Sequence, residues 1–412
     1  MLKPDLEKLK PDSKKRTPAV EDKMTKAFLL LEDGSAFAGE RFGAPGDVVC
    51  EMVFNTGLTG YLELLTDASY AGQGIVMSSP IIGNYGVFSE HGEAARPWAE
   101  AMIVRDLTHV VHDDRDAEDL DAYLTRYGIP AIRGIDTRAV TLRLREKGTM
   151  NGMITAGPAY DEADCLRRIK AYVNSDPVAR VSRKQIDVYP AGSTGRIHRP
   201  AGVARPADAL LHLPYEIKPV VRQFRVAMLD FGLKQNIVWN LARRGCEVTV
   251  YPWNTTADVI LAAQPDGIVL SNGPGDPVDC QPIVPSVRKL FESGIPMLAI
   301  CLGHQLLALA TGARTRRLKY GHRGVNHPVK DLAADRVYIT SQNHSYVVVD
   351  ETVDPLIAEI SHIHLNDGSV EGLRYKARPV ISVQYHPEGA PGPQDSEYLF
   401  DDFLALMRAA RS

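Results

Sequence analysis

The sequence predicts an α/β protein in which a doubly wound, mostly parallel C-terminal sheet follows a smaller, strand-rich mixed α/β domain. Three observations support this prediction. The chain has 412 residues, which is too long for one ordinary domain. Beyond about residue 222, short apolar runs alternate with helical patterns, as is typical of a parallel sheet covered on both faces. Before about residue 185 the runs are rich in β-forming residues and interrupted by Gly and Pro.

The first 26 residues are expected to form a disordered extension. They carry eight basic and five acidic side chains and lack an apolar segment, which argues against a secretory signal. An N-terminal domain is predicted over residues 27–184. Its expected strands lie at 27–31, 48–54, 74–77 and 101–104, and its expected helices at 117–127 and 138–147.

A linker is predicted over residues 185–222, where Gly and Pro are frequent and periodicity is weak. The C-terminal domain then covers residues 223–412. Its expected strands lie at 226–229, 247–251, 267–270, 296–300 and 380–384, with helices at 235–244 and 285–292. Ligands of such sheets bind at the carboxyl ends of the strands, so the segments that follow these strands are the candidate site.

Composition excludes several classes of function. The formal net charge of -4 gives no electrostatic reason to expect nucleic acid or a membrane surface as a partner. No apolar run reaches the roughly 18 residues that a membrane span needs. The five cysteines lack CxxC spacing, which favours reduced thiols in the cytoplasm over disulfides or a zinc site.

The most informative residue is Cys301, which ends the apolar run 296–300 and precedes an apolar helix. At such an elbow the strand fixes the backbone, Gly303 permits a sharp bend, and the helix N-terminus favours a negatively charged nucleophile. A buried cysteine that serves as a small hydrophobe is the alternative. Its partners must therefore decide between the two interpretations.

A candidate base follows the strand at 380–384. There, Pro387 keeps His386 extended, so that the imidazole and the Glu388 carboxylate point to the same side. A carboxylate that orients an imidazole, which in turn deprotonates a thiol, is the arrangement of a catalytic triad. Taken alone, this motif is also consistent with a turn that ends a strand. The nucleophile elbow at Cys301 favours the catalytic interpretation.

Residues 271–277 read Ser-Asn-Gly-Pro-Gly-Asp-Pro, directly after another predicted strand. Glycine lets backbone N–H groups approach a developing oxyanion. The segment lacks the Lys-Ser/Thr ending of a P-loop and the spacing of a dinucleotide site, so we reject nucleotide binding there.

These three motifs, in this order, resemble the class I (triad) glutamine amidotransferase domain over about residues 225–410. Ala299 departs from the family, which usually has glycine there. The resemblance implies that Cys301 attacks the side-chain amide of L-glutamine, that His386 transfers the proton, and that Glu388 orients His386. It also implies that the N–H groups of Leu302 and Gly273 form the oxyanion hole. The further residues it implies for glutamine binding are Gly275, Gln305, Asn343, Ser345 and Tyr346.

Six further segments resemble the carbamoyl phosphate synthetase small-subunit family, five of them in the N-terminal domain: 55–61, 66–70, 82–86, 134–138, 142–148 and 229–234. The resemblance implies that ammonia passes to a large subunit, which makes carbamoyl phosphate from bicarbonate and ATP for arginine or pyrimidine biosynthesis, or both. ATP and Mg²⁺ are expected on that subunit and no cofactor on this chain. A cytoplasmic heterodimer, open to further assembly, is implied. Gly57 stands where the family often has a serine near glutamine.

Two alternatives remain: a stand-alone γ-glutamyl or glutamine hydrolase, and a non-catalytic regulatory subunit. The N-terminal domain argues against the first, and the complete set of Cys301, His386 and Glu388 against the second. His304 and His344 lack a following carboxylate, so we expect them to be structural or close to the substrate. Residues 321–328 hold two histidines without nearby acidic or thiol ligands, and no metal site is predicted there.

Overall fold

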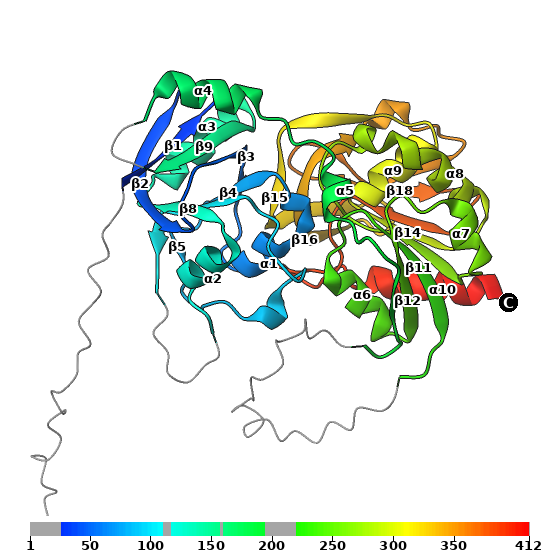
Figure 1. Cartoon of the computed structure of the whole chain (residues 1–412). Coiled ribbons are helices and arrows are strands. Elements are labelled where there is room, and N and C mark those ends of the chain that lie inside the picture. The colour runs from blue at the N-terminus through cyan, green and yellow to red at the C-terminus, as the bar shows by residue number, and fades with distance from the viewer. Residues whose placement is uncertain (1–25, 110–116, 157–159, 194–219, 412) are drawn as a thin grey trace, which may run out of the picture.

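The computed structural model describes residues 26–109, 117–156, 160–193 and 220–411. Apart from Lys26, the predicted N-terminal extension lies outside these residues. The described chain forms a closed barrel and a large sheet that lie side by side (Figure 1). The α/β class and the strand-rich N-terminal domain are confirmed.

The barrel has the strand order β1-β2-β8-β6-β4-β3-β9, and its closure leaves no strand edge exposed. Its strands are β1 (Lys26–Leu31), β2 (Ala36–Gly43), β3 (Val48–Asn55), β4 (Gln73–Met77), β6 (Ala101–Ile103), β8 (Pro130–Arg133) and β9 (Met150–Ala156). The predicted strands correspond to β1, β3, β4 and β6. A separate two-stranded sheet joins β5 (Ile81–Ile82) to β7 (Asp106–Leu107).

The helices of this half are α1 (Tyr61–Thr66), α2 (Leu120–Tyr127), α3 (Thr137–Lys147), α4 (Glu162–Ala171) and α5 (Pro177–Val181). Local capping explains α2 and α3, the two helices of this half that the sequence predicted. The Asp119 carboxylate accepts from the N–H groups that open α2, and Gly128 ends it with a left-handed φ of 73°. Asp136 caps α3 by accepting from the N–H of Ala139.

The second sheet has ten strands in the order β10-β12-β11-β13-β14-β19-β18-β17-β15-β16. The five central strands are parallel, as predicted: β12 (Cys246–Pro252), β11 (Phe224–Asp230), β13 (Gly267–Leu270), β14 (Met297–Ile300) and β19 (Val380–Val383). The outer strands pair antiparallel: β10 (Asp187–Tyr189), β15 (Thr315–Asp331), β16 (Arg336–Val348), β17 (Ala358–His364) and β18 (Val370–Tyr375). The strand β10 falls within the segment predicted as a linker.

Helices cover both faces of the parallel strands, as a doubly wound sheet requires. One face packs on α6 (Gln235–Ala242) and α10 (Tyr398–Arg411), and the other on α7 (Ala257–Ala262), α8 (Val284–Glu292) and α9 (Leu302–Ala310). Successive strand residues alternate between these cores. Met228 belongs to the first core together with Phe400, and Leu229 to the second together with Leu306.

The barrel contacts the sheet along β15. The N–H of Thr149 donates to the carbonyl of Lys319, and the N–H of Thr56 to that of Arg323. Phe54 packs against Tyr320, with 5.8 Å between the ring centroids. These contacts place the end of the barrel against the strand pair β15–β16, where the candidate site lies.

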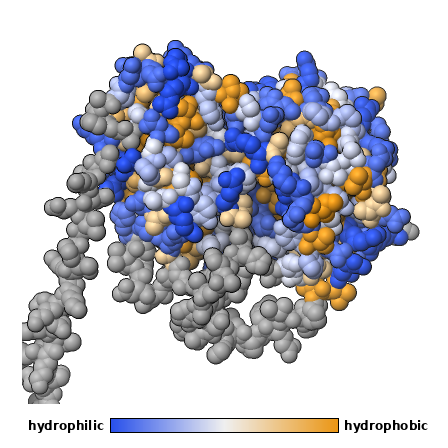
Figure 2. Space-filling model, viewed as in Figure 1, coloured by the Kyte–Doolittle hydropathy of each residue, from blue (hydrophilic) through white to orange (hydrophobic). Residues whose placement is uncertain are grey.

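Figure 2 shows hydrophilic residues over most of one face, with hydrophobic residues in small groups. Within the described ranges, no helix is both long and apolar enough to cross a membrane.

Candidate active site

Cys301 lies at the junction of β14 and α9, as the elbow pattern predicted. Its φ of 54° and ψ of -106° are sparsely populated for a residue with a side chain, so the surrounding fold holds it in a strained conformation. The N–H of Cys301 donates to the carbonyl of Val383 on the neighbouring strand at 2.9 Å. Gly303 is required there, because a Cβ would come within 2.3 Å of the Leu270 carbonyl oxygen.

His386 and Glu388 follow β19, whose last residue accepts the Cys301 hydrogen bond. His386 Nδ1 lies 2.7 Å from Glu388 Oε1, and the His386 N–H donates to the carbonyl of Ser341 at 3.0 Å. All three predicted triad residues are at most 2% exposed. The other ring nitrogen, His386 Nε2, has no hydrogen-bond partner within the described part of the chain and is free for a proton transfer.

A fourth buried side chain, Lys234, contacts Glu388 and extends the row formed by Cys301, His386 and Glu388. It directly precedes α6, and its Nζ lies 2.8 Å from Glu388 Oε1 with only 2% of the side chain exposed. Glu93, from the N-terminal half, is also buried and accepts from the N–H groups of Gln235 and Asn236. Sequence reasoning placed Lys234 in a family segment but assigned it no role.

The electrostatics of the row follow from burial and pairing. Burial alone would raise the pKa of Glu388, but Lys234 and His386 lower it to about 2. Burial alone would lower the pKa of His386, but Glu388 and Cys301 raise it to about 10. The pKa of Lys234 is raised because Glu388, Glu93 and Asp67 outweigh its burial. Glu388 is therefore an anion at neutral pH, and His386 holds a proton that it can give up to a leaving group.

Cys301 lines a cavity of about 330 Å³ between the two halves of the chain. Six predicted glutamine-binding residues line the same cavity: Gly273, Gly275, Gln305, Asn343, Ser345 and Tyr346. The Cys301 thiol also lies 3.7 Å from the Asn343 carbonyl oxygen. The structure therefore brings the predicted nucleophile and most of the predicted binding residues to one place.

Leu302 does not line the cavity but packs against Gly273. A Cβ on Gly273 would lie 2.9 Å from Leu302 Cδ2 and 2.2 Å from the Phe231 carbonyl oxygen, so only glycine fits at this position.

Gly57 is not among the residues that line the cavity, although the resemblance implied a place near glutamine. Its N–H donates to Asn55 Oδ1, and a Cβ there would contact Val325. Ser69, in the short 3₁₀ helix Ala68–Tyr70, does line the cavity, together with other residues of the N-terminal half such as Glu51 and Asn151. Ser69 Oγ accepts from Asn272 Nδ2 at 3.0 Å.

The two halves are also joined beside the cavity by Asp67 and Asn343. Asn343 Nδ2 donates to Asp67 Oδ2 at 2.9 Å, and Asp67 Oδ1 accepts from the N–H of Ser69. Because Asn343 comes from β16, this hydrogen bond ties the barrel to the strand that lines the cavity. Sequence reasoning did not identify it.

The other histidines divide as follows. His304 is fully buried on α9 and bonded to Ser382 Oγ, and burial lowers its pKa to about 3, so it is not a base at neutral pH. His344 lines the cavity. His322 and His327 lie close to His344 and His364, and Glu371 and Asp367 reach His322 from distant parts of the sequence. All five cysteines are free and buried.

Comparisons with known proteins agree with both halves of this description. The family model of class I glutamine amidotransferases matches residues 227–406, and that of the carbamoyl-phosphate synthase small chain, CPSase domain, matches residues 29–154. The solved structure of a putative GMP synthase subunit from Thermoplasma acidophilum covers 46% of this chain and 96% of its own, at TM-score 0.42 and 20% identity.

Full-length relatives extend the match to nearly the whole chain. The carbamoyl phosphate synthase small chain of Bacillus caldolyticus is 44% identical over 384 residues, which is 93% of this chain and 97% of that protein. The protein of the same name from Thioalkalivibrio sulfidiphilus is 45% identical over 388 residues, covering 93% and 98%. This chain therefore belongs to the family of carbamoyl phosphate synthase small chains, with a class I glutamine amidotransferase domain as its C-terminal half.

Proposed function

We propose that this chain releases ammonia from L-glutamine and passes it to a separate large subunit, which makes carbamoyl phosphate from bicarbonate and ATP. The observation that carries the proposal is the buried row of Cys301, His386 and Glu388 behind a polar cavity. A thiol, a base and an orienting carboxylate in this order suit acyl transfer from a primary amide.

The proposed reaction has two halves. Cys301 Sγ attacks the amide carbon of glutamine as a thiolate whose proton is held by His386, and the N–H groups of Leu302 and Gly273 hold the tetrahedral oxyanion. The C–N bond then breaks as His386 returns the proton to the leaving ammonia. Water, deprotonated by His386, hydrolyses the γ-glutamyl thioester to glutamate and restores the thiol.

Glutamine recognition is assigned to the polar wall of the cavity. The Gln305 amide nitrogen already donates to the Tyr346 carbonyl and to Gln384 Oε1, so the Gln305 oxygen is the atom left to accept from substrate N–H groups. Asn343, Ser345, Tyr346 and Gly275 complete this side of the proposed site, and Ser69 takes the place first assigned to Gly57.

The proposed partner, a large subunit, is inferred from the family to which the chain belongs. Relatives over nearly the whole chain are named small chains, which supports a heterodimer with a large subunit that holds ATP and Mg²⁺. We further propose a cytoplasmic location and a product that feeds arginine biosynthesis, pyrimidine biosynthesis or both.

The test compares nitrogen sources in the complex reconstituted with the large subunit. Cys301→Ser is expected to abolish carbamoyl phosphate synthesis from glutamine and to leave synthesis from ammonia intact. Cys246→Ala is the matched control, because Cys246 is buried in the same half but lies on β12 and is not among the residues that line the cavity. Glutamine use by Cys301→Ser would refute the mechanism, and glutamine hydrolysis without any large-subunit binding would favour the stand-alone hydrolase.

A further inference from the structure

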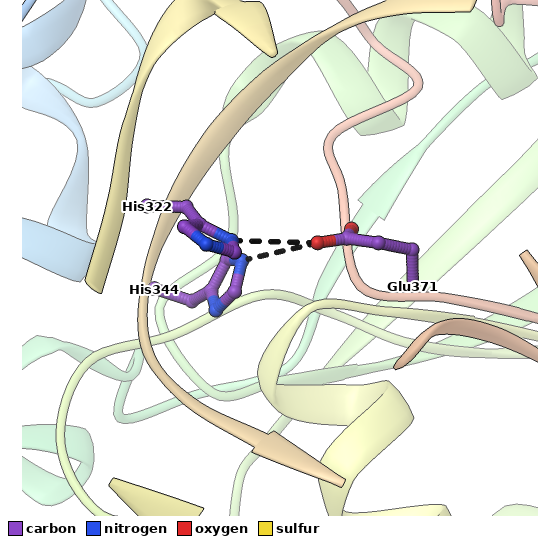
Figure 3. Close-up of side chains that lie close together, drawn as sticks. All are labelled: His322, His344 and Glu371. Atoms are coloured by element: carbon purple, nitrogen blue, oxygen red, sulfur yellow. Dashed lines mark ion pairs between the residues drawn. The ribbon is translucent and has the colours of Figure 1, made fainter. Parts of the chain in front are cut away.

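A cluster of buried polar side chains lies behind the cavity wall formed by β16. His322 comes from β15, His344 from β16 and Glu371 from β18 (Figure 3). His322 Nδ1 lies 3.5 Å and His344 Nε2 3.8 Å from the same carboxylate oxygen, Glu371 Oε1. All three residues are at most 5% exposed, and one nitrogen or oxygen of each lies within 4.8 Å of the other two.

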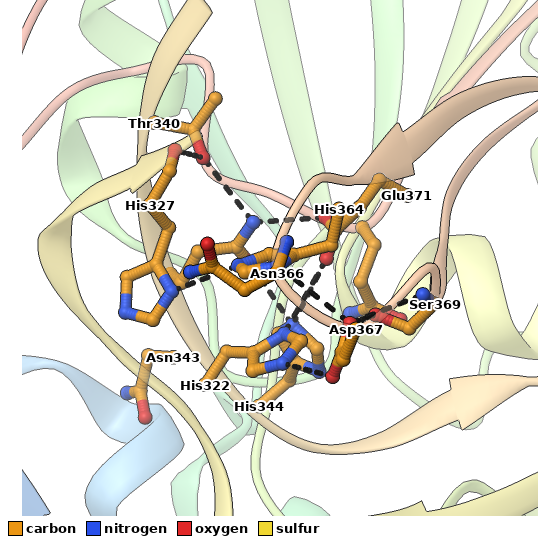
Figure 4. A network of polar contacts seen from close by, with 12 residues as sticks. His322, His327, Thr340, Asn343, His344, His364, Asn366, Asp367, Ser369 and Glu371 are labelled. Carbon is orange, nitrogen blue, oxygen red and sulfur yellow. Dashed lines mark hydrogen bonds and ion pairs between the residues drawn. The ribbon is translucent and has the colours of Figure 1, made fainter. Parts of the chain in front are cut away.

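The outer hydrogen bonds of the two rings suit metal binding by the inner nitrogens, and Figure 4 shows the one between His322 and Asp367. His322 Nε2 lies 2.9 Å from Asp367 Oδ2, and His344 Nδ1 lies 2.9 Å from the Tyr346 carbonyl oxygen. Both partners are acceptors only, so each of these nitrogens carries the proton. In neutral rings with these tautomers, His322 Nδ1 and His344 Nε2 present lone pairs toward Glu371, as metal ligands must. Metal-binding histidines are oriented by outer partners of these types.

Gln342 adds another acceptor to the same space. Its amide nitrogen donates to Glu371 Oε2 at 2.8 Å and to Thr340 Oγ1, which fixes the orientation of the amide. The amide oxygen is thereby turned toward His344 Nε2, at 2.9 Å. His322 Nδ1 and Glu371 Oε1 have no hydrogen-bond partner within the described residues. Without a metal, His322 and Glu371 compensate each other only as an ion pair at 3.5 Å, and a cation between them would bond to both.

We propose that His322 Nδ1, His344 Nε2 and Glu371 Oε1 bind a divalent transition-metal ion, Zn²⁺ in the first instance. Two imidazole nitrogens and a carboxylate oxygen are ligands typical of zinc, and Gln342 Oε1 lies in place for a fourth position. The sequence predicted no metal site here, because no acidic residue lies near His322 along the chain. Strand pairing supplies the missing carboxylate from β18.

A second grouping shares His322 but suits a metal less well. It consists of His322, His364 and Asp367, and Asp367 is partly exposed. The Asp367 carboxylate already accepts from Ser369 and faces His322 Nε2. His364 Nε2 already lies 3.0 Å from His327 Nδ1. In the first grouping, by contrast, His322 Nδ1 and Glu371 Oε1 make no hydrogen bond within the described residues.

The proposed ion is structural, because it ties three strands together behind the cavity. His344 directly follows Asn343, and the carbonyl of Glu371 accepts from the N–H of Gln384, two residues before His386. A metal at this point would hold the cavity wall and the segment that carries the base in a fixed relation. It takes no part in the proposed chemistry, so its test does not depend on glutaminase activity.

The test measures metal bound to the purified full-length chain after chelation and reloading with Zn²⁺. We expect one tightly held equivalent per chain and a rise in melting temperature on loading. Glu371→Gln is expected to weaken binding by about 100-fold or more, since loss of an outer partner alone costs about 10–100-fold. The chain loaded with Co²⁺ is expected to show an absorption spectrum of nitrogen and oxygen ligands, without thiolate charge transfer.

Two controls make the result decisive. His364→Asn removes a buried histidine of the same cluster and is expected to leave stoichiometric binding intact. Zinc bound by wild type without any loading, and lost in Glu371→Gln, would be further support. The proposal is overturned by no stoichiometric binding, by binding that survives Glu371→Gln but not His364→Asn, or by a thiolate band. If Glu371→Gln does not fold, the Co²⁺ spectrum of the wild-type chain decides by itself.

Discussion

Lys234 and Glu388 form an ion pair of 2.8 Å in which neither side chain is more than 2% exposed. The pair joins the turn after β11 to the segment after β19, and it shares Glu388 Oε1 with His386 Nδ1. A buried cation thus supports the carboxylate that orients the base. We infer that Lys234 is a positioning residue that acts through Glu388.

Lys234→Met is expected to destabilise the chain by about 3–5 kcal/mol, because it leaves the Glu388 carboxylate buried without its cation. Chemical denaturation measures the change. Lys289→Met is the matched control: its partner is Asp258, both side chains are mostly exposed, and the expected change is at most about 1 kcal/mol. Equal losses in the two variants would contradict the role assigned to Lys234.

Glu388→Gln is expected to lower glutaminase kcat by about 10²- to 10⁴-fold, the range that general acid–base catalysis contributes. The amide does not carry the negative charge that holds the pKa of His386 near 10. The pKa of His386 is therefore expected to fall, and NMR titration of the labelled imidazole measures it. Glu292→Gln, on the exposed end of α8, should change neither quantity. An unchanged His386 pKa in Glu388→Gln would refute the pairing.

Burial raises the pKa of Glu93 to about 7 from an ordinary value of 4.5. Between these two pH values the unfolded chain has lost the Glu93 proton while the folded chain still holds it. The contribution of Glu93 to stability is thus fully present below pH 4.5 and decreases as pH rises toward 7, with a slope of up to about 1.4 kcal/mol per pH unit. Glu388 has the opposite effect on stability, because its pKa in the folded chain is lowered to about 2. Its contribution is present above about pH 4.5 and is lost as pH falls toward 2.

Glu93→Gln tests this dependence, because the amide does not titrate and keeps an acceptor for the N–H of Asn236. The difference in unfolding free energy between wild type and variant should change across pH 4.5–7 and level off below it. A difference that is constant across this range would show that Glu93 does not titrate there.

Much of the fold and of the triad could be predicted from local sequence. The parallel strands are continuous apolar runs because both of their faces are buried, and the Cys301 elbow and the segment around Pro387 are local motifs. The antiparallel strands β15 and β16 were not predicted. Their register shifts twice, and their buried residues include His322 and Asn343 rather than an alternating apolar set.

The missed site residues depend on contacts between distant segments. Lysine is usually a surface residue, and the buried charge of Lys234 is compensated by three carboxylates from distant segments, those of Glu388, Glu93 and Asp67. Gly57 and Ser69 both lie in segments that resemble the family, but α1 separates them and only Ser69 reaches the cavity. Glu371 meets His322 through strand pairing alone. No local pattern encodes any of these contacts.

The hydrogen bond between Asp67 and Asn343 makes glutamine binding depend on the contact between the two halves. Asp67→Asn removes the negative charge opposite Asn343 Nδ2, and hydrogen bonds to charged groups contribute about 1.5–3 kcal/mol. We expect KM for glutamine to rise by about 10- to 100-fold. The exchange variant Asp67→Asn with Asn343→Asp restores one carboxylate and one amide in reversed positions. If the interaction itself sets KM, the exchange should recover part of the loss, as a double-mutant cycle of steady-state kinetics measures. Strictly additive effects of the two substitutions would instead show that each residue contacts glutamine independently.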